Sequence, residues 1–229
     1  MTTRLSLPKE VAGITLPDSA MATAATRLAQ EASPEFLFNH CVRTYVLGSL
    51  AGRRAHMTFD PELLYLAAIL HDLGLTPAGA GTERFEVDGA DAAREFCLTQ
   101  AVAPDQADRV WDAIALHSTP GIPPRKSPEA ALVQIGAGID VLGVGREVIE
   151  LADLQRVMAA VPRHGFSRKF IELVTAIGMR KPTQHAFTWV AELGHLYVHG
   201  FPGPTYRELF PQWTAVVEPE EGALPTALA

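Results

Sequence analysis

Apolar residues recur along most of the chain at the three- and four-residue spacing of helices, and connections rich in Pro and Gly separate these segments. No segment shows the sustained apolar–polar alternation, enriched in β-branched residues, that is typical of strands. The pattern therefore predicts an all-α protein. We expect about nine helices, at residues 19–31, 34–55, 61–73, 89–100, 104–118, 128–143, 147–161, 168–180 and 184–199.

Three of these helices are expected to begin with a capping residue followed by proline, at Ser33-Pro34, Asp60-Pro61 and Ser127-Pro128. Proline is tolerated there because the first helical amides have no partner within the helix.

The pattern also suggests how the chain is divided. We expect an irregular N-terminal arm at residues 1–17, one helical domain at residues 18–212 and a tail at residues 213–229.

Composition excludes several classes of protein. The chain has 229 residues, 19 Lys and Arg, 26 Asp and Glu, a net charge of −7 and 48% apolar residues. A disordered protein would have fewer apolar residues, and a nucleic-acid binder would carry a basic excess. We therefore expect no nucleic-acid partner.

Membrane insertion and export are not expected either. The longest wholly apolar run, residues 63–70, is far shorter than the 18 or more residues of a membrane helix. Residues 1–9 lack the apolar region of a signal peptide, so we expect a cytoplasmic protein. Cys41 and Cys97 are expected to be buried free thiols.

Ionisable residues interrupt the most apolar helices. The run at residues 63–70 is apolar on every face and leads directly into His71 and Asp72, and the apolar segment 130–139 leads into Asp140. Burying an isolated carboxylate costs several kcal/mol, so such groups are paired, neutralised or bound to a metal.

His40 and His117 lie in similar apolar surroundings. Three histidines and two aspartates thus face one expected core, and four of them stand in the last turns of helices, where the helix dipole favours a cation. A divalent metal would satisfy the whole set. Each residue alone has an ordinary alternative, such as a satisfied core histidine or an ion pair between Asp140 and Arg43.

The order His40, His71-Asp72, Asp140 on successive buried helices resembles the HD superfamily of metal-dependent hydrolases. The resemblance rests on the motifs NHCVRTY at 39–45, AAILHDLG at 67–74 and GIDVLG at 138–143. Within the superfamily, RFEVDG at 84–89 and IALH at 114–117 look like the cyanamide hydratases and their bacterial relatives. The likeness covers residues 34–195 and implies an HD-domain helical bundle.

By this resemblance the metal ligands are His40, His71, Asp72 and Asp140. Imidazoles with carboxylates suit zinc, iron, manganese or nickel better than calcium or magnesium. With cyanamide hydratase as the guide, we expect one zinc ion per chain. Phe85 stands where the binuclear HD phosphodiesterases have a further histidine ligand, which indicates a mononuclear site and leaves His117 for catalysis.

The expected reaction is the addition of a metal-activated water to a small molecule, here the nitrile carbon of a cyanamide-like substrate, to give a urea-type product. His117 would donate a proton to the nitrogen, and Asp72 would orient the water as well as bind the metal.

Three further residues, Arg43, Glu86 and Thr119, are candidates for substrate contacts. Their ordinary alternatives are an ion pair of Arg43 with Glu86, Asp88 or Asp140, and a helix cap at Asp88 ahead of Gly89.

Two other functions stay open at this stage. An HD-type phosphohydrolase of nucleotides or other small phosphate esters could hold phosphate with Arg125, Lys126 and the following helix N-terminus, in a loop that otherwise is a surface turn. The second open function is a domain without catalytic activity that uses the metal only for structure or for binding a partner. The C-terminal helices could pair two copies of the chain. His56, His164 and His185 are expected to be exposed.

Overall fold

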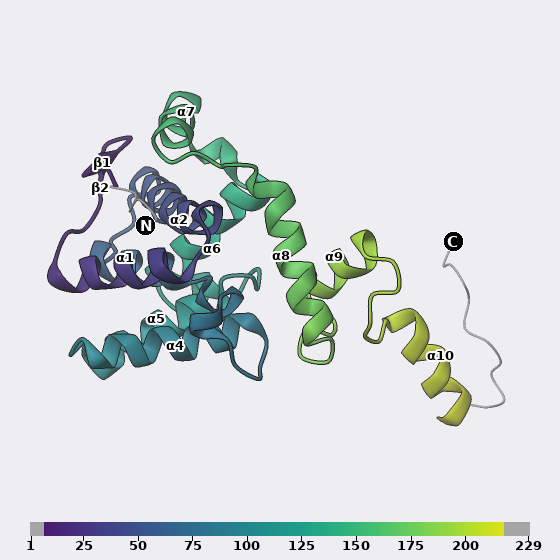
Figure 1. Ribbon diagram of the computed structural model, residues 1–229. Coiled ribbons are helices and arrows are strands. Elements are labelled where there is room, and N and C mark those ends of the chain that lie inside the picture. Colours follow the sequence, from purple (N-terminus) through teal and green to yellow (C-terminus); the bar gives the residue numbers. More distant parts are fainter. Residues whose placement is uncertain (1–6, 218–229) are drawn as a thin grey trace. The chain divides into compact units, whose positions relative to one another are not determined.

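Helices make up most of the computed structural model, which describes residues 7–217 (Figure 1). The predicted all-α class is confirmed, because the described part contains ten α-helices, four 3-10 helices and one ladder of two two-residue strands. The α-helices are α1 (Ala20–Ala32), α2 (Glu35–Arg54), α3 (Pro61–Leu70), α4 (Phe85–Thr99), α5 (Pro104–Leu116), α6 (Pro128–Leu142), α7 (Leu151–Ala160), α8 (Phe166–Arg180), α9 (Trp189–Tyr197) and α10 (Tyr206–Val217). The 3-10 helices are η1 (Leu73–Leu75), η2 (Pro77–Gly79), η3 (Pro123–Arg125) and η4 (Arg146–Val148).

The chain forms two units, Met1–Phe170 and Ile171–Ala229. The single domain expected at residues 18–212 therefore spans both units. No helix among residues 7–217 combines the length and the apolar character needed to cross a membrane.

Two of the three predicted helix caps are present. The carboxylate of Asp60 accepts hydrogen bonds from the first amides of α3, and the Ser127 hydroxyl accepts one from Ala130 N in α6. The third prediction is wrong: the Ser33 amide donates to Ala29 O and closes α1, and α2 begins at Glu35 without a side-chain cap. The backbone of Ser33 is extended, as expected for a residue before proline.

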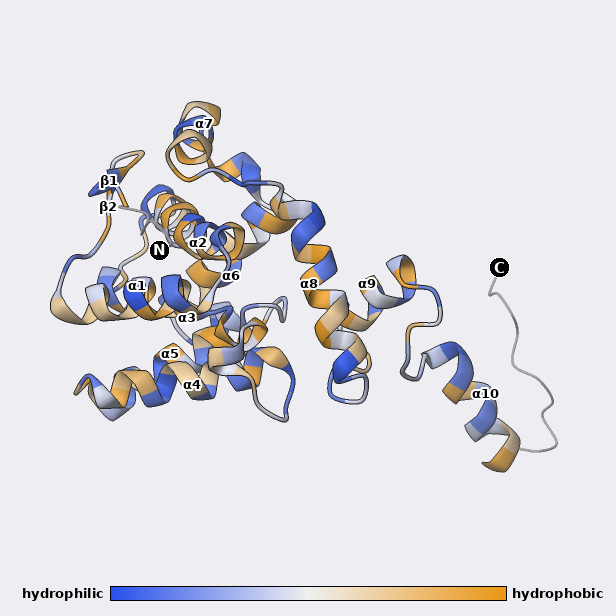
Figure 2. Ribbon diagram, viewed as in Figure 1, coloured by the Kyte–Doolittle hydropathy of each residue, from blue (hydrophilic) through white to orange (hydrophobic). Residues whose placement is uncertain are grey.

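The first unit is built around α3, whose residues 63–70 are all buried. Figure 2 gives the hydropathy of each residue along the ribbon. The helices α2 and α6 pack closely beside it. A Cβ atom added at Gly136 of α6 would lie only 2.1 Å from Thr44 O of α2, so glycine is required there. This contact fixes α2 and α6, which carry His40 and Asp140, against each other.

The N-terminal segment is more ordered than predicted. Strands β1 (Glu10–Val11) and β2 (Ile14–Thr15) pair antiparallel, with Val11 opposite Ile14. Both apolar side chains are buried, and Tyr45 Oη donates a hydrogen bond to Thr15 O. The described part of the expected irregular arm is thus a small hairpin held by the core, whereas residues 1–6 lie outside the described residues.

Two helix boundaries differ from the prediction in ways that matter below. The helix α4 begins at Phe85 instead of residue 89, so Glu86 and Asp88 lie in its first turn and Asp88 is not its cap. The Asp88 carboxylate instead accepts a hydrogen bond from Glu83 N. The helix α10 was not predicted, and its last five residues fall within the expected tail, the rest of which lies outside the described residues.

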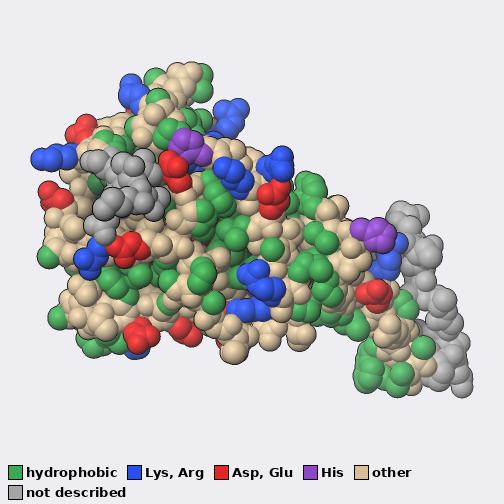
Figure 3. Space-filling model, in the orientation of Figure 1, with side chains coloured by type: hydrophobic (Ala, Val, Ile, Leu, Met, Phe, Trp, Pro, Cys, Tyr) green, Lys and Arg blue, Asp and Glu red, His purple; other side chains and the backbone are tan. Residues whose placement is uncertain are grey.

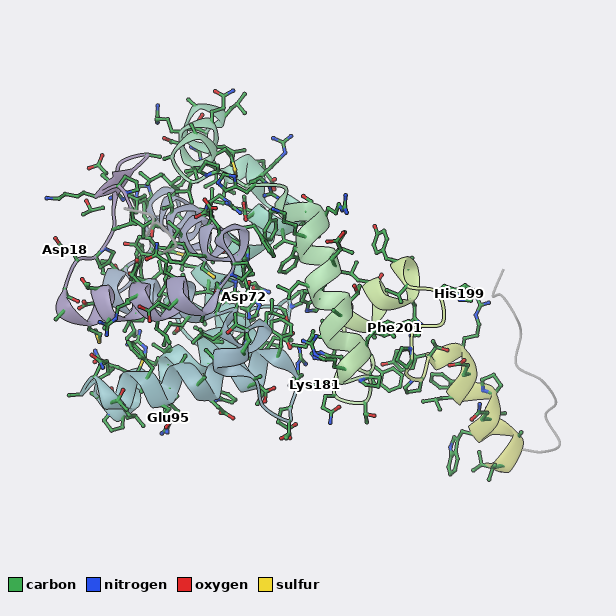
Figure 4. The ribbon with its side chains drawn as sticks, viewed as in Figure 1. Asp18, Asp72, Glu95, Lys181, His199 and Phe201 are labelled. Atoms are coloured by element: carbon green, nitrogen blue, oxygen red, sulfur yellow. The ribbon has the colours of Figure 1, made fainter. Side chains whose placement is uncertain are left out.

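In the second unit, the ring of Phe201 packs against Gly178 of α8 and Gly194 of α9 (Figure 4). His185 is fully buried, so the expectation that it is exposed was wrong.

Candidate metal centre

The predicted site residues of the first unit come from five segments of the chain. His40 lies on α2, His71 and Asp72 form the turn after α3, Glu86 opens α4, His117 ends α5 and Asp140 lies near the end of α6. The helix α4 holds the His-Asp turn in place, since a Cβ atom at Gly74 would lie 1.9 Å from Phe85 O. Figure 4 labels Asp72 among the side chains packed between these helices.

Three ligand-type atoms converge at the centre of this unit. His40 Nε2 and His71 Nε2 are 3.2 Å apart, and Asp72 Oδ2 lies 3.6 Å from the first and 3.4 Å from the second. The three residues are at most 2% exposed. They are the only group among residues 7–217 whose His, Cys, Asp or Glu atoms gather in this way. Asp72 Oδ2 has no hydrogen-bond partner.

The partners of the two rings fix which nitrogens carry protons when both rings are neutral. His71 Nδ1 lies 2.8 Å from the carbonyl oxygen of Ala68, which can only accept a hydrogen bond, so the proton is on Nδ1 and the lone pair on Nε2. His40 Nδ1 likewise donates to Asp140 Oδ2, at 2.7 Å. Two nitrogen lone pairs and a carboxylate oxygen therefore face one another, an arrangement that a cation between them stabilises.

The spacing of the three atoms fits a metal ion. Ligands at about 2.0–2.2 Å from a tetrahedral ion are roughly 3.3–3.6 Å apart, and the three distances observed here span 3.2–3.6 Å. A proton on His40 Nε2 would satisfy the pair of nitrogens but would leave Asp72 Oδ2 without a hydrogen bond. Burial lowers the pKa of His71 to about 3, helped by His40, and raises the pKa of Asp72.

Asp140 lies beside this group, but its carboxylate is fully hydrogen-bonded. Its Oδ1 accepts from Arg43 Nε and Arg163 Nη1, and its Oδ2 from Arg43 Nη2 and His40 Nδ1, at 2.7–2.8 Å. Burial alone would raise the pKa of Asp140, but the hydrogen bonds from His40 and Arg43 hold it well below its usual range. The pairing of Arg43 with Asp140, one of the alternatives from the sequence, is what the structure contains.

His117 lies on the other side of His71, and their rings meet edge to face with centroids 4.9 Å apart. His117 Nδ1 is 2.6 Å from Ile114 O, so in the neutral ring the lone pair is on Nε2. Burial and the neighbouring His71 lower the pKa of His117 to about 4. The side chain is therefore a proton acceptor at neutral pH and can donate only a proton that it has first taken up.

Glu86, which is fully buried, connects the start of α4 to the chain after α5. It accepts two hydrogen bonds from the Arg84 guanidinium, at 2.7 and 3.0 Å, and one from Ser118 Oγ at 2.6 Å. Burial alone would raise the pKa of Glu86, but Arg84, His117 and Ser118 lower it to about 2. Thr119 is partly buried, and its amide donates to Leu116 O.

Two phenylalanines pack beside His40, and the sequence analysis did not identify them. Phe166 stacks on the His40 ring with centroids 4.7 Å apart, and Phe170 stacks on Phe166 at 4.8 Å. The guanidinium of Arg163, which binds Asp140, lies over the face of Phe166. The only signal in the sequence is the four-residue spacing of the two phenylalanines, which also occurs in any buried helix.

The basic loop considered for phosphate binding lies elsewhere. Lys126 Nζ pairs with Asp112 Oδ2 at 3.0 Å, at the start of α6. Asp140 lies twelve positions after Pro128 on α6, which places it about 18 Å along the helix axis from the start of the helix.

Comparison with known proteins agrees with this geometry. The family model of the HD domain matches residues 37–141, which run from α2 to α6 and include every residue of the converging group. A comparison with curated proteins found no match. Residues 37–141 of this chain are therefore similar to the HD domain, and they contain a buried candidate metal site made of two histidines and one aspartate.

Proposed function

We propose that the protein is a metal-dependent hydratase or hydrolase that adds water to a small, uncharged nitrile, as cyanamide hydratases do. The observation that carries the proposal is the convergence of His40 Nε2, His71 Nε2 and Asp72 Oδ2, with no hydrogen bond to the last atom. A divalent cation held there would lower the pKa of a coordinated water towards 7 and would polarise the substrate. Zinc is our first choice because of its tetrahedral preference, and iron, manganese and nickel are alternatives.

The resemblance adds Asp140 as a fourth ligand. Its carboxylate accepts a hydrogen bond from Nδ1 of His40, whose Nε2 is one of the three converging atoms. Ligation would require one oxygen to leave the His40 or guanidinium contacts. The visible absorption of cobalt-loaded protein distinguishes the two cases: Asp140→Ala should change the band intensity, which reports the number of ligands, if the carboxylate is a direct ligand, and should only shift the bands slightly if Asp140 acts through His40.

We assign proton transfer to His117. Its Nε2 lone pair takes a proton from the attacking water, and the resulting imidazolium returns that proton to the substrate nitrogen. The nitrile carbon gains the water oxygen, and the nitrogen gains both water protons, one through His117 and one from the hydroxyl of the imidic acid formed first. No group leaves, so the product is an amide, or urea when the substrate is cyanamide. We no longer assign a substrate contact to Arg43, because its guanidinium is paired with Asp140. Glu86 and Thr119 stay candidates for substrate contacts.

Burial and charge pairing favour a small neutral substrate over a phosphate ester. His40, His71, Asp72, Glu86 and His117 are at most 8% exposed. The guanidiniums of Arg43 and Arg163 pair with Asp140, and that of Arg84 pairs with Glu86. Phosphate binding requires cationic donors that are available to the ligand.

The test is an assay of the metal-quantified protein with cyanamide, beside nucleoside mono-, di- and triphosphates. We expect urea release and about one metal ion per chain, with both lost in His71→Ala and Asp72→Ala. His199→Ala, at an exposed histidine, is the matched control and keeps both. Phosphate release without urea release would overturn the substrate, and protein purified without metal that also fails to take up zinc, cobalt or iron would overturn the site.

A further inference from the structure

The helix α10 has an apolar face that the described residues of its unit leave largely exposed. Six of its large apolar side chains are 40–70% exposed, namely Tyr206, Leu209, Phe210, Trp213, Val216 and Val217. No residue of α10 is buried. At 100° per residue the six lie within an arc of about 120°, and Arg207 and Glu208 project from the other side of the helix. Figure 3 shows hydrophobic side chains gathered on this part of the surface.

The size of this face indicates a binding surface. Phe187 extends it, because its ring packs against Tyr206 with centroids 4.4 Å apart and it is itself 46% exposed. From these exposed fractions we estimate on the order of 800 Å² of accessible surface, more than the largest apolar patch of an ordinary monomer, about 300–600 Å². About 800 Å² per partner is the area that a standard protein interface buries.

The spacing of the stripe points to a second helix of the same kind. Tyr206, Phe210, Trp213 and Val217 follow one another at intervals of four, three and four residues, the spacing that lines a seam between two helices. This series reads the same from both ends. A second α10 running antiparallel therefore places Tyr206 opposite Val217 and Phe210 opposite Trp213, as a two-fold axis requires.

The charges around the stripe disfavour a lipid surface. Helices that lie on membranes carry Lys and Arg on their polar face, whereas α10 has one Arg and one Glu. Three glutamates follow it in the sequence, at 218, 220 and 221, and the whole chain carries −7. An aromatic stripe without charges is typical of the centre of a protein interface.

We propose that the apolar face of α10 is the seam of a homodimer in which two copies of α10 pair antiparallel about a two-fold axis. The inference is independent of the proposed function, since it rests on residues of the second unit only.

The test is the mass of the full-length protein by sedimentation equilibrium or light scattering. We expect twice the chain mass of 24.7 kDa for the unchanged protein and the chain mass for Phe210→Glu. Ala215→Glu adds the same charge on the opposite side of α10 and should stay dimeric. Unchanged metal content of Phe210→Glu shows that its HD domain is folded.

A monomeric unchanged protein, or a dimer that survives Phe210→Glu, would overturn the proposal. So would binding of the unchanged protein as a monomer to vesicles of phosphatidylglycerol.

A cross-linking experiment tests the antiparallel arrangement. Phe210→Cys mixed with Trp213→Cys should form a disulfide between chains, and each variant alone should form less. Cys41 and Cys97 are buried and do not compete. Equal cross-linking of either variant with itself would rule out the antiparallel seam.

Discussion

At the scale of single residues, the metal centre depends on where two protons lie. The Ala68 carbonyl and the Asp140 carboxylate each hold a proton on Nδ1 of a histidine, and both Nε2 atoms are thereby left as acceptors. Asp72 Oδ2 is a third acceptor at the same place. Because it is buried without a hydrogen bond, it destabilises the metal-free protein. Function and stability therefore oppose each other at Asp72.

Replacing Asp72 with Asn should make the metal-free protein more stable. The amide has the same shape, and its NH₂ group can donate to a histidine lone pair, so we expect a gain of about 1–3 kcal/mol at pH 8 in a chelator. Zinc should no longer raise the melting temperature. Thermal unfolding with and without zinc measures both effects, and Asp18→Asn, at an exposed aspartate, is the control. A loss of stability in the chelator would contradict this account.

Glu86 should make the protein sensitive to acid. Its pKa in the folded protein, about 2, lies below its ordinary value of 4.5, so its stabilising contribution is complete above pH 4.5 and is lost as the pH falls towards 2. The contribution is on the order of 3 kcal/mol. Denaturant unfolding should show Glu86→Gln less stable than the unchanged protein at pH 7, with a difference that narrows towards pH 3. Glu95→Gln, exposed on the same helix, should show no such difference.

The sequence allows the His40, His71 and Asp72 group to be predicted because each residue interrupts an apolar helix. It also allows Arg43 to be considered as the partner of Asp140, as the structure has it. It does not allow the hydrogen bond from Arg163 to be predicted, because Arg163 is 23 residues away along the chain and lies in no recognisable motif.

At the scale of the elements, the close contact of α2 and α6 aligns the helices that carry His40 and Asp140. Their glycines leave no room for side chains at the crossing. In contrast, Gly138 of α6 has space for a side chain, since no atom lies within 4 Å of a Cβ atom added there.

These two glycines of α6 should respond oppositely to alanine. We expect Gly136→Ala to destabilise the protein by at least about 2 kcal/mol and to weaken metal binding, because the helices must separate. Gly138→Ala should stabilise it by about 0.5–1 kcal/mol through helix propensity. Denaturant unfolding and metal titration compare the two, and similar effects of both substitutions would show that the helix contact is not what matters.

Helices with a buried apolar face were predictable, and most of their positions agree with the structure. The first turn of α4 was not predictable, because Glu86 and Asp88 are polar residues typical of a loop. Their burial depends on hydrogen bonds from Arg84, Ser118 and the Glu83 amide, which only the structure shows. The helix α10 was missed, and Pro211 stands inside it.

At the scale of the whole molecule, all the residues of the candidate site belong to the unit Met1–Phe170. The division was not predictable, because α8 is one continuous helix that contains the boundary at residue 170. Metal binding should therefore stabilise the unit Met1–Phe170 directly, but not the unit Ile171–Ala229.

Calorimetry of the full chain should show two transitions, of which only one shifts with zinc. A ligand that binds one folded unit stabilises that unit by about 2.7 kcal/mol at one hundred times its dissociation constant. His71→Ala should abolish the shift and leave the other transition in place. A single transition that moves as a whole with zinc would mean that the two units unfold together.

The near-complete burial of His40, His71 and Asp72 has a consequence for how the cation is exchanged. A chelator is much larger than a small nitrile, so release of the metal to it would wait for a wider local opening of α2, α3 and α6 than the substrate needs. The rate of metal loss would then be independent of chelator concentration and would rise with denaturant. In a cell, the choice of metal would be made when the chain folds rather than by later competition among ions.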